Sequence, residues 1–381
     1  TATCNPLFTE VTKPIGNSGN YILCQDVYSP IHMPPFRQSA MDGYAVNFHE
    51  NANYSLIGEI KAGDGQTIDL KKGEAIRIFT GSPVPDSANA VIIQENVSRN
   101  MDTIYCEDKI RLNQNIRPLG EQVKKGDLAL AKGTKLTPAA IGYLSSLGIT
   151  EVSVFKKPSI ALVTTGNELV EPGQPLPYGK IYESNSKMLQ NALYNLKFYD
   201  VTIHTIEDDY DTTYATLKTL INKKDLVIIS GGISVGDYDF VGKALDGLEV
   251  ATLFYKVKQK PGKPLYFGKK ERTLIFALPG NPAASLTCFY LYVYIALQKL
   301  MNRDLIELPR TKAKSNSEFN KKGDRPQFLK AVFQNKTATI LEGQSSAMLQ
   351  TFALSNALVF MPLETSKIRV NDDVEVILLP T

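Results

Sequence analysis

Four short polar clusters in the middle of the chain contain residue types that could bind an anion together with a cation. Each follows an apolar run, and they cover residues 164–168, 207–209, 230–237 and 279–282. In the third cluster, Gly231 and Gly232 would let backbone N–H groups approach an anion closely. Ser230 and Ser234 are further donors there. The spacing is that of neither a dinucleotide-binding nor a Walker loop, and an ordinary strand-to-helix turn is the alternative.

The fourth cluster, Pro279-Gly280-Asn281-Pro282, predicts the start of a helix, with Asn281 as N-cap and Pro282 in the first turn. A helix N-terminus has free N–H groups and a partial positive charge, so it could bind the same anion. A well-capped helix without a ligand explains these residues at least as well.

Glu168, Asp208 and Asp239 add carboxylates to the same set of residues. An anion beside carboxylates needs a bridging cation, and oxygen ligands favour Mg²⁺. The alternative for Asp208 and Asp239 is that each caps the helix that follows it. Zinc is not expected, because the three histidines are dispersed and the four cysteines form no CxxC pair.

Lysines alternate at positions 256, 258 and 260, so in a strand Lys256, Lys258 and Lys260 would all lie on one face. Lys263 follows in a Pro-Gly-Lys-Pro sequence. Such a face could bind phosphate. It could equally be a solvated face that protects the edge of a sheet.

Two segments far upstream also contain polar residues in short motifs. Residues 39–45 lead into an Asp-Gly turn at Asp42, and residues 80–85 begin Thr-Gly-Ser-Pro at Thr80. Both patterns are typical of turns, and their chemistry alone assigns them no function.

Strands and helices in alternation would position the four central clusters. Apolar strands are predicted at residues 159–164, 201–206, 226–230 and 273–278, each followed by a helical pattern. This order predicts a doubly wound, mostly parallel sheet covered by helices. Because the carboxyl ends of parallel strands face one crevice, we expect the clusters to meet there.

The flanking regions follow a different pattern. Residues 21–155 are predicted to be mainly β structure, with one helix near residues 138–147. Short strands beyond residue 303 predict a small separate β domain. A length of 381 residues suits several domains, so the predicted architecture is multidomain α/β plus β.

Composition argues against several classes of protein. Forty-two Lys and Arg against 39 Asp and Glu give a net charge of +3, which offers no basis for binding nucleic acid or a membrane surface. Residues 1–30 lack the apolar core of a signal peptide. The uncharged stretch 281–298 contains polar residues and favours a buried helix over a membrane span. We therefore predict a cytoplasmic protein.

Taken in order, these motifs resemble the molybdopterin molybdotransferase (molybdenum insertase) family, which includes the E domain of gephyrin. The resemblance covers nearly the whole chain from about Tyr21, and the first twenty residues match poorly. It rests on residues 39–46, 79–85, 90–95, 117–120, 164–169, 179–185, 230–239, 260–264, 278–282 and 344–349.

The resemblance implies an activity: adenylylated molybdopterin binds, molybdate is inserted at its dithiolene, and the adenylate is cleaved with Mg²⁺-dependent release of AMP. It implies a homodimer, with the molybdopterin adenylyltransferase and acceptor molybdoenzymes as possible partners. It also implies a central α/β molybdopterin-binding domain, flanking β-rich domains and a small C-terminal β-barrel. The expected domains are 1–43 with 119–155, 44–118, 156–303 and 304–381.

The family's site residues transfer by motif. The resemblance implies catalytic roles for Asp42, Thr80, Glu168, Asp208 and Asp239, and all of these except Thr80 would also hold the metal ion. Asp42 and Thr80 belong to the β portion, so the site would lie between domains, and in the family between two subunits. The implied substrate-binding residues are Gly231, Gly232, Ser234, Lys260, Lys263, Pro279, Asn281, Pro282, Ser345 and Ser346.

Some positions depart from the family pattern. Gln122 stands where an aspartate is expected, Ala347 where glycine is common, and Arg37-Gln38 where Asp-Asn is frequent. A pterin carrier that has lost insertion through Gln122 is therefore one alternative. Another is a nucleotide pyrophosphatase with the related α/β domain, which would leave Asp42 and Thr80 unexplained.

Overall fold

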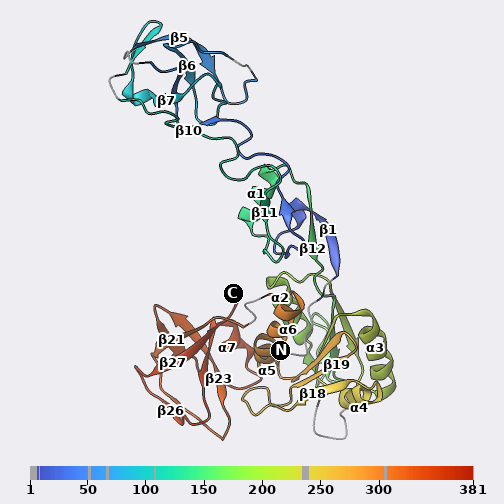
Figure 1. The fold of residues 1–381 in the computed structure, drawn as a ribbon. Coiled ribbons are helices and arrows are strands. Elements are labelled where there is room, and N and C mark those ends of the chain that lie inside the picture. The colour runs from blue at the N-terminus through green and yellow to red at the C-terminus, as the bar shows by residue number, and fades with distance from the viewer. Residues whose placement is uncertain are drawn as a thin grey trace. The chain divides into compact units, whose positions relative to one another are not determined.

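The computed structural model describes residues 7, 9–49, 53–65, 68–106, 109–233, 240–303 and 307–380. The chain forms two compact units, one of Thr1–Thr9 with Phe155–Thr381 and the other of Glu10–Val154 (Figure 1). Each unit is described by itself below.

A six-stranded sheet forms the centre of the larger unit (Figure 1). Its order is β16 (Val201–Ile206), β13 (Ile160–Thr165), β17 (Leu226–Ser230), β20 (Thr273–Leu278), β19 (Tyr266–Lys270) and β18 (Ala251–Tyr255). The first four strands are parallel, β19 is antiparallel to β20, and β18 is antiparallel to β19. The predicted mostly parallel sheet is confirmed, and the four predicted strands are shifted by one residue at most.

Helices cover both faces of this sheet, as the doubly wound prediction requires. On one face, α3 (Tyr210–Lys223) and α4 (Phe240–Gly247) pack against inward residues of the strands, such as Val163 and Ile229. On the other lie α2 (Asn185–Asn195), α5 (Pro282–Cys288) and α6 (Tyr294–Leu300) (Figure 1).

Helix α5 continues through a π-helical turn, η3 (Phe289–Val293), into α6. The whole run Pro282–Leu300 is long and apolar enough to cross a membrane, but 72% of it is buried inside the fold. This is the arrangement of a core helix, as predicted for the stretch.

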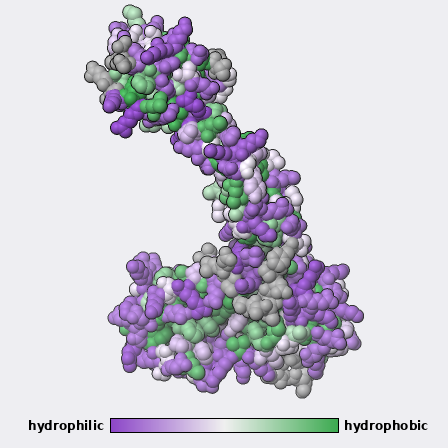
Figure 2. All heavy atoms as spheres, in the orientation of Figure 1, coloured by the Kyte–Doolittle hydropathy of each residue, from purple (hydrophilic) through white to green (hydrophobic). Residues whose placement is uncertain are grey.

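Hydrophilic residues dominate the face drawn in Figure 2, and hydrophobic residues form smaller patches between them.

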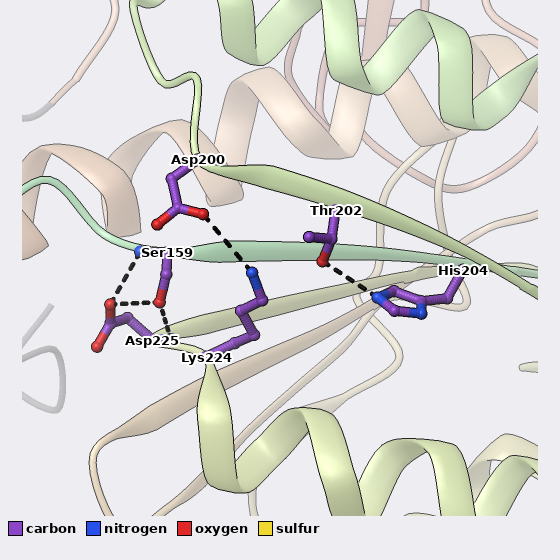
Figure 3. Close-up of polar contacts among 6 residues, drawn as sticks. All are labelled: Ser159, Asp200, Thr202, His204, Lys224 and Asp225. Atoms are coloured by element: carbon purple, nitrogen blue, oxygen red, sulfur yellow. Dashed lines mark hydrogen bonds and ion pairs between the residues drawn. The ribbon is translucent and has the colours of Figure 1, made fainter.

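The amino ends of the parallel strands are joined by buried polar contacts (Figure 3). Asp225, just before β17, accepts hydrogen bonds from the backbone N–H (2.8 Å) and the hydroxyl (2.7 Å) of Ser159, just before β13. Nearby, Lys224 Nζ lies 3.6 Å from an Asp200 oxygen. Burial, together with the charge of Lys224, lowers the pKa of His204 on the edge strand. These contacts fix the starts of the strands.

The C-terminal part of the larger unit is a closed β-barrel, which confirms the predicted small β domain. Its strands are β21 (Arg310–Ser315), β24 (Thr337–Ile340), β23 (Gln327–Gln334), β25 (Ala357–Met361) and β27 (Asp373–Leu378). Small and branched residues such as Ala331, Val359 and Val376 fill its core. Between β24 and β25 the chain forms a loop and the short helix α7 (Leu349–Ala353).

The unit Glu10–Val154 is mainly β structure, as predicted. Its largest sheet has the order β7 (Ala90–Ile93), β4 (Gly43–Val46), β6 (Glu74–Ile78), β5 (Asn53–Ile60), β9 (Thr103–Tyr105) and β8 (Ser98–Asn100). Two-stranded pairs join β1 (Glu10–Pro14) to β12 (Glu151–Phe155), β2 (Val27–Tyr28) to β11 (Leu128–Leu130) and β3 (Gln38–Ser39) to β10 (Ile116–Arg117). The predicted helix is α1 (Pro138–Ser146), capped by the Thr137 hydroxyl.

Residues 256–260 do not form a strand, so the common lysine face that the alternation would give does not arise. Strand β18 ends at Tyr255, and Lys256 has a φ of +64°, which takes the chain out of the extended conformation. Lys256 packs over the Tyr255 ring and Lys258 forms an exposed ion pair with Asp324, at 3.8 Å. Only Lys260 and Lys263 of this group belong to the site described below.

Candidate active site

A cavity of about 1010 Å³ lies at the carboxyl edge of the parallel sheet. The register of the strands explains the position of the cavity. Thr164 on β13 pairs with Ser230 on β17, and Ser230 pairs with Leu278 on β20. The polar clusters that follow these strands therefore start at one level. This edge also contains the switch point between β13 and β17, where open α/β sheets bind ligands.

Most of the predicted site residues lie around this one cavity. These are Glu168, Asp208, Gly231, Gly232, Lys260, Lys263, Pro279, Asn281, Pro282, Ser345 and Ser346. Ser234 and Asp239 lie outside the described residues. Asp42 and Thr80 belong to the other unit. Convergence of the clusters is thus as expected, and their individual roles stay predictions.

The turn after β17 needs glycine at two successive positions. Gly231 has a φ of +92°, and a Cβ there would lie 2.6 Å from the Thr165 carbonyl oxygen. Gly232 has a φ of +63°, and its Cβ would lie 2.6 Å from both the Thr165 hydroxyl and Val241 Cγ2. The backbone therefore passes directly over the end of β13, a path that a side chain would block.

Asn185, at the start of α2, joins two strand ends across the cavity. Its Nδ2 donates to Ser230 Oγ (2.8 Å) and to the Gly280 carbonyl (2.7 Å). Its Oδ1 is buried without a hydrogen-bond partner among the described residues, as is the Thr165 hydroxyl. Buried polar atoms without a partner are rare in native proteins, and both residues line the cavity. Thr165 belongs to the predicted polar cluster 164–168 and Asn185 to the matched stretch 179–185, but neither was among the predicted site residues.

Of the neighbouring carboxylates Asp208 and Asp209, only the second caps a helix. Asp209 accepts from the backbone N–H groups of residues 211 and 212 at the start of α3. Asp208 instead exchanges hydrogen bonds with Asn167: its N–H donates to Asn167 Oδ1 (3.2 Å), and Asn167 N–H donates to Asp208 Oδ2 (3.4 Å). Asp208 lines the cavity, and its carboxylate accepts from Asn167 and not from the helix, which decides against the capping alternative for this residue.

Three residues with carboxylates, Glu168, Asp208 and Glu183, line the cavity. Glu183 accepts hydrogen bonds from the N–H and the hydroxyl of Ser186, whereas Glu168 and Asp208 offer oxygen ligands that suit a hard divalent cation. Glu168 lies over Gly166, where an added Cβ would be 2.8 Å from one of its oxygens. No group of three or more His, Cys, Asp or Glu side chains with metal-binding geometry occurs in the described parts of the chain. The oxygen donors of Glu168 and Asp208 are thus of the kind that suits Mg²⁺.

Helix α5 begins at the cavity with Asn281 as N-cap and Pro282 in its first turn, as predicted. The Asn281 side chain makes no capping hydrogen bond. Its Nδ2 donates instead to Ser346 Oγ (2.9 Å) in the loop from the barrel, and Ala284 N–H donates to the Ser346 carbonyl (3.2 Å). Asn281 therefore connects the helix to the barrel loop.

The loop that carries Lys260 and Lys263 is fixed on both sides. Lys260 N–H donates to the Pro326 carbonyl and Phe328 N–H donates to the Lys260 carbonyl, both at 2.9 Å, which attaches the loop to β23 of the barrel. Gln259, 2% exposed, accepts from the Tyr292 hydroxyl of η3. The backbone that carries the two lysines is thus fixed at the cavity wall.

Arg325 is a cavity residue that the sequence analysis missed. It lines the cavity, and its Nη1 donates to the Gln259 carbonyl at 3.1 Å. An isolated arginine in a polar loop gives no sequence signal, because its approach to Gln259 joins positions 66 residues apart.

Asp42 and Thr80 contact each other within the unit Glu10–Val154. Thr80 donates both its N–H and its hydroxyl to Asp42 Oδ1, each at 2.7 Å. The backbone N–H first, and then the hydroxyl, hold the pKa of Asp42 below its ordinary value. The second oxygen, Oδ2, has no hydrogen-bond partner among the described residues, so an ionised carboxylate with one open oxygen is exposed here.

Family models match almost the whole chain. A model of the MoeA N-terminal region (domain I and II) matches residues 2–148, a probable molybdopterin-binding domain matches residues 161–299, and a model of the MoeA C-terminal region (domain IV) matches residues 312–379. The first matches the unit that contains Asp42, and the other two match the parts that line the cavity.

Whole proteins match over a similar extent. A molybdopterin molybdenumtransferase from Haemophilus influenzae is 34% identical over 94% of this chain and 91% of its own length. Molybdopterin molybdenumtransferase 2 from Mycobacterium tuberculosis is 30% identical, with 98% and 95% covered. The crystal structure of the molybdopterin biosynthesis MoeA protein from Pyrococcus horikoshii OT3 matches with a TM-score of 0.81 at 30% identity, over 98% of this chain and 96% of that one. The chain therefore belongs to the MoeA family of molybdopterin molybdenumtransferases, enzymes of molybdenum cofactor biosynthesis.

Proposed function

We propose that this enzyme inserts molybdate into adenylylated molybdopterin and releases AMP in a Mg²⁺-dependent reaction. The observation that supports this most is the composition of the cavity at the carboxyl edge of the sheet, in which Glu168 and Asp208 occur together with Lys260, Lys263 and Arg325. A ligand that satisfies both sets of charges is a polyanion bound with a cation. A nucleotide diphosphate ester and a molybdate ion meet that requirement.

The cationic side chains would bind the diphosphate and the oxyanion. Lys260 and Lys263 act as ammonium donors, and Arg325 can donate two parallel hydrogen bonds to a tetrahedral oxyanion. The backbone at Gly231 and Gly232 can approach a phosphate because no side chain intervenes. Arg325 and the backbone at Gly231 and Gly232 are held in place by the fold without a substrate, which favours stabilisation of the charge that develops as the phosphoanhydride breaks.

Glu168 and Asp208 would hold the Mg²⁺ ion, and from the family resemblance Asp239 and Asp42 would join them. The ion would neutralise charge on the diphosphate. The Asn167 N–H donates to the Asp208 carboxylate, and the Asp208 backbone N–H donates to the Asn167 side chain, so both the carboxylate and the backbone of Asp208 are held by Asn167. The hydrogen bonds from Thr80 lower the pKa of Asp42, which favours the ionised form of this carboxyl.

The test is AMP release from adenylylated molybdopterin by the purified full chain, at low molybdate, with and without Mg²⁺. AMP release that requires both ions would support the proposal. Tight binding of the pterin without AMP would favour the carrier alternative, and Gln122→Asp should then restore some turnover. Faster cleavage of simple dinucleotides than of the pterin adenylate would favour a pyrophosphatase.

We further propose a cytoplasmic homodimer in which Asp42 and Thr80 complete the site of the other subunit. The motif match supports this arrangement. Light scattering after size-exclusion chromatography would give the mass of the protein in solution. Mixed dimers of Asp42→Asn and Asp208→Asn subunits would test whether the two subunits share one site. Recovery of activity on mixing two inactive variants is expected. Molybdopterin adenylyltransferase and acceptor molybdoenzymes are the partners to test by pull-down.

A further inference from the structure

A buried lysine lies behind the barrel loop that reaches the cavity. Lys330, on β23, is 4% exposed, and its Nζ donates to the carbonyl oxygens of Gly343 (2.8 Å), Ser345 (3.1 Å) and Met348 (2.9 Å). An ammonium group has three N–H donors, so all of them are used. No carboxylate in the described chain lies within ion-pair distance of it.

The loop gains a second attachment to the same residue through Gln344. Lys330 N–H donates to Gln344 Oε1 (2.9 Å), and Gln344 Nε2 donates to the carbonyls of Lys330 (2.9 Å) and Leu341 (2.7 Å). The backbone and the side chain of Lys330 thus both hold residues 341–348. Burial lowers the pKa of the ammonium, so keeping a charge here has a cost that hydrophobic packing of the loop would avoid.

The peptide between Ser345 and Ser346 connects this charge to the cavity. A trans peptide is planar, with its C=O and N–H pointing in opposite directions. Because the Ser345 carbonyl points to the ammonium, the Ser346 N–H points away from it. That N–H has no acceptor among the described residues, and Ser346 lines the cavity. A carbonyl polarised by a cation makes its own N–H a stronger donor.

We propose that Lys330 is a positioning residue for the transferase reaction: it orients and polarises the Ser345–Ser346 peptide so that the Ser346 N–H binds a tetrahedral oxyanion. The oxyanion also supplies the counter-charge that the protein does not provide for the ammonium. This inference rests on the proposed function, and the oxyanion is either molybdate or the phosphate of AMP. Lys330 itself touches neither ligand.

The experiment compares Lys330→Met, Lys330→Gln and Lys330→Arg in the full-length protein, with Lys312→Met as a matched control on an exposed position of the same barrel. Equilibrium dialysis measures binding of molybdate and of AMP separately. In Lys330→Met, the Ser346 N–H would no longer be oriented and polarised by a charge. We therefore expect binding of either molybdate or AMP to be about 10-fold to 100-fold weaker, the effect of losing one charge-assisted hydrogen bond. Lys330→Gln, which keeps donors but no charge, should show a similar loss. Lys330→Arg should restore most of the affinity, and Lys312→Met should match the wild type.

Weaker molybdate binding alone would assign the peptide to molybdate, and weaker AMP binding alone would assign it to the nucleotide phosphate. Unchanged binding of both by a folded Lys330→Met or Lys330→Gln protein would overturn the inference. Equal weakening of both ligands, with a lower melting temperature and no rescue by arginine, would also overturn it, since that is the result of general loop disorder. Dialysis does not depend on turnover. Failure of the wild type to release AMP would therefore reject the proposed function without deciding this question.

Discussion

The two ends of the parallel sheet contain the same kinds of residue in opposite conditions. At the amino ends, Ser159 and Asp225 are buried and satisfy each other through hydrogen bonds of 2.7–3.2 Å (Figure 3). At the carboxyl ends, the Thr165 hydroxyl and Asn185 Oδ1 are buried without partners among the described residues and border a cavity. The difference shows that burial of polar groups marks stability when they are paired. Polar groups left unpaired beside a cavity indicate binding.

The topology of the sheet explains why the open end is the carboxyl end. Each parallel strand leads into a helix there, so loops and the N-terminus of α5 gather at one edge. Free backbone N–H groups at such an edge favour an anion. At the opposite edge, chains return from helices to strands, and the contacts made there only align the starts of the strands.

The largest expected effect is at the open end. Asp208→Asn should lower kcat/KM for AMP release at least about 100-fold, because the amide removes one negative charge from the proposed metal site. The matched control is Asp209→Asn next to it, and Asn caps helices as well as Asp does. Steady-state kinetics at several Mg²⁺ concentrations would measure both. Equal losses in the two variants would contradict the assignment of Asp208 to the cavity and Asp209 to the cap.

At the amino ends of the strands, Asp225→Ala should lower the free energy of unfolding by about 2–4 kcal/mol, because it leaves buried donors of Ser159 without an acceptor. Activity per folded molecule should not change. Asp200→Ala is the control, since its ion pair with Lys224 is half exposed and should contribute less than about 1 kcal/mol. Urea unfolding gives both free energies. A lower kcat in folded Asp225→Ala would contradict the purely structural role of the contacts at the amino ends.

The glycine turn gives a smaller effect that combines stability with binding. Gly232→Ala should destabilise the fold by about 1–3 kcal/mol, through its positive φ and through overlap with Thr165 and Val241. Gly173→Ala, also at positive φ but in open space, isolates the strain from the overlap. Thermal melting and molybdate dialysis would measure the two contributions. A Gly232→Ala protein that behaves like Gly173→Ala would show that the turn tolerates a side chain.

The smallest effect is expected in the other unit, where Thr80 acts on Asp42. Thr80→Val removes the hydroxyl donor but keeps the N–H, so the pKa of Asp42 should rise part of the way towards its ordinary value. Because the folded-state pKa is lowered, the stability linked to it is present above the unfolded pKa and is lost as pH falls through the folded pKa. Thr80→Val should therefore lose less stability on acidification. NMR titration of the Asp42 carboxyl tests this, and Thr80→Ser should retain the wild-type value.

Much of the fold could be predicted because its signals are local. Alternating apolar strands and helices required a parallel sheet, and Pro282 after Asn281 marked the start of α5. Polar clusters directly after strands had to meet at one edge. The site itself was less predictable. In a strand, the alternating residues Lys256, Lys258 and Lys260 would lie on one face. The left-handed conformation at Lys256 follows the end of β18, so these lysines do not form that face.

The sequence by itself determined the architecture of the larger unit and the edge of the sheet at which the polar clusters meet. Strand alternation, helix starts and glycine turns are each encoded by a few neighbouring residues. Only the tertiary structure decided the use of individual side chains. It assigned the helix cap to Asp209 and paired Asp208 with Asn167. It turned Asn281 from its own helix to Ser346, placed Arg325 at the cavity, and placed the buried Lys330 behind the loop that carries Ser345. The physical reason is that a side chain forms whichever hydrogen bond the folded chain offers. For Asn281 and Arg325 the partner is more than 60 residues away in sequence.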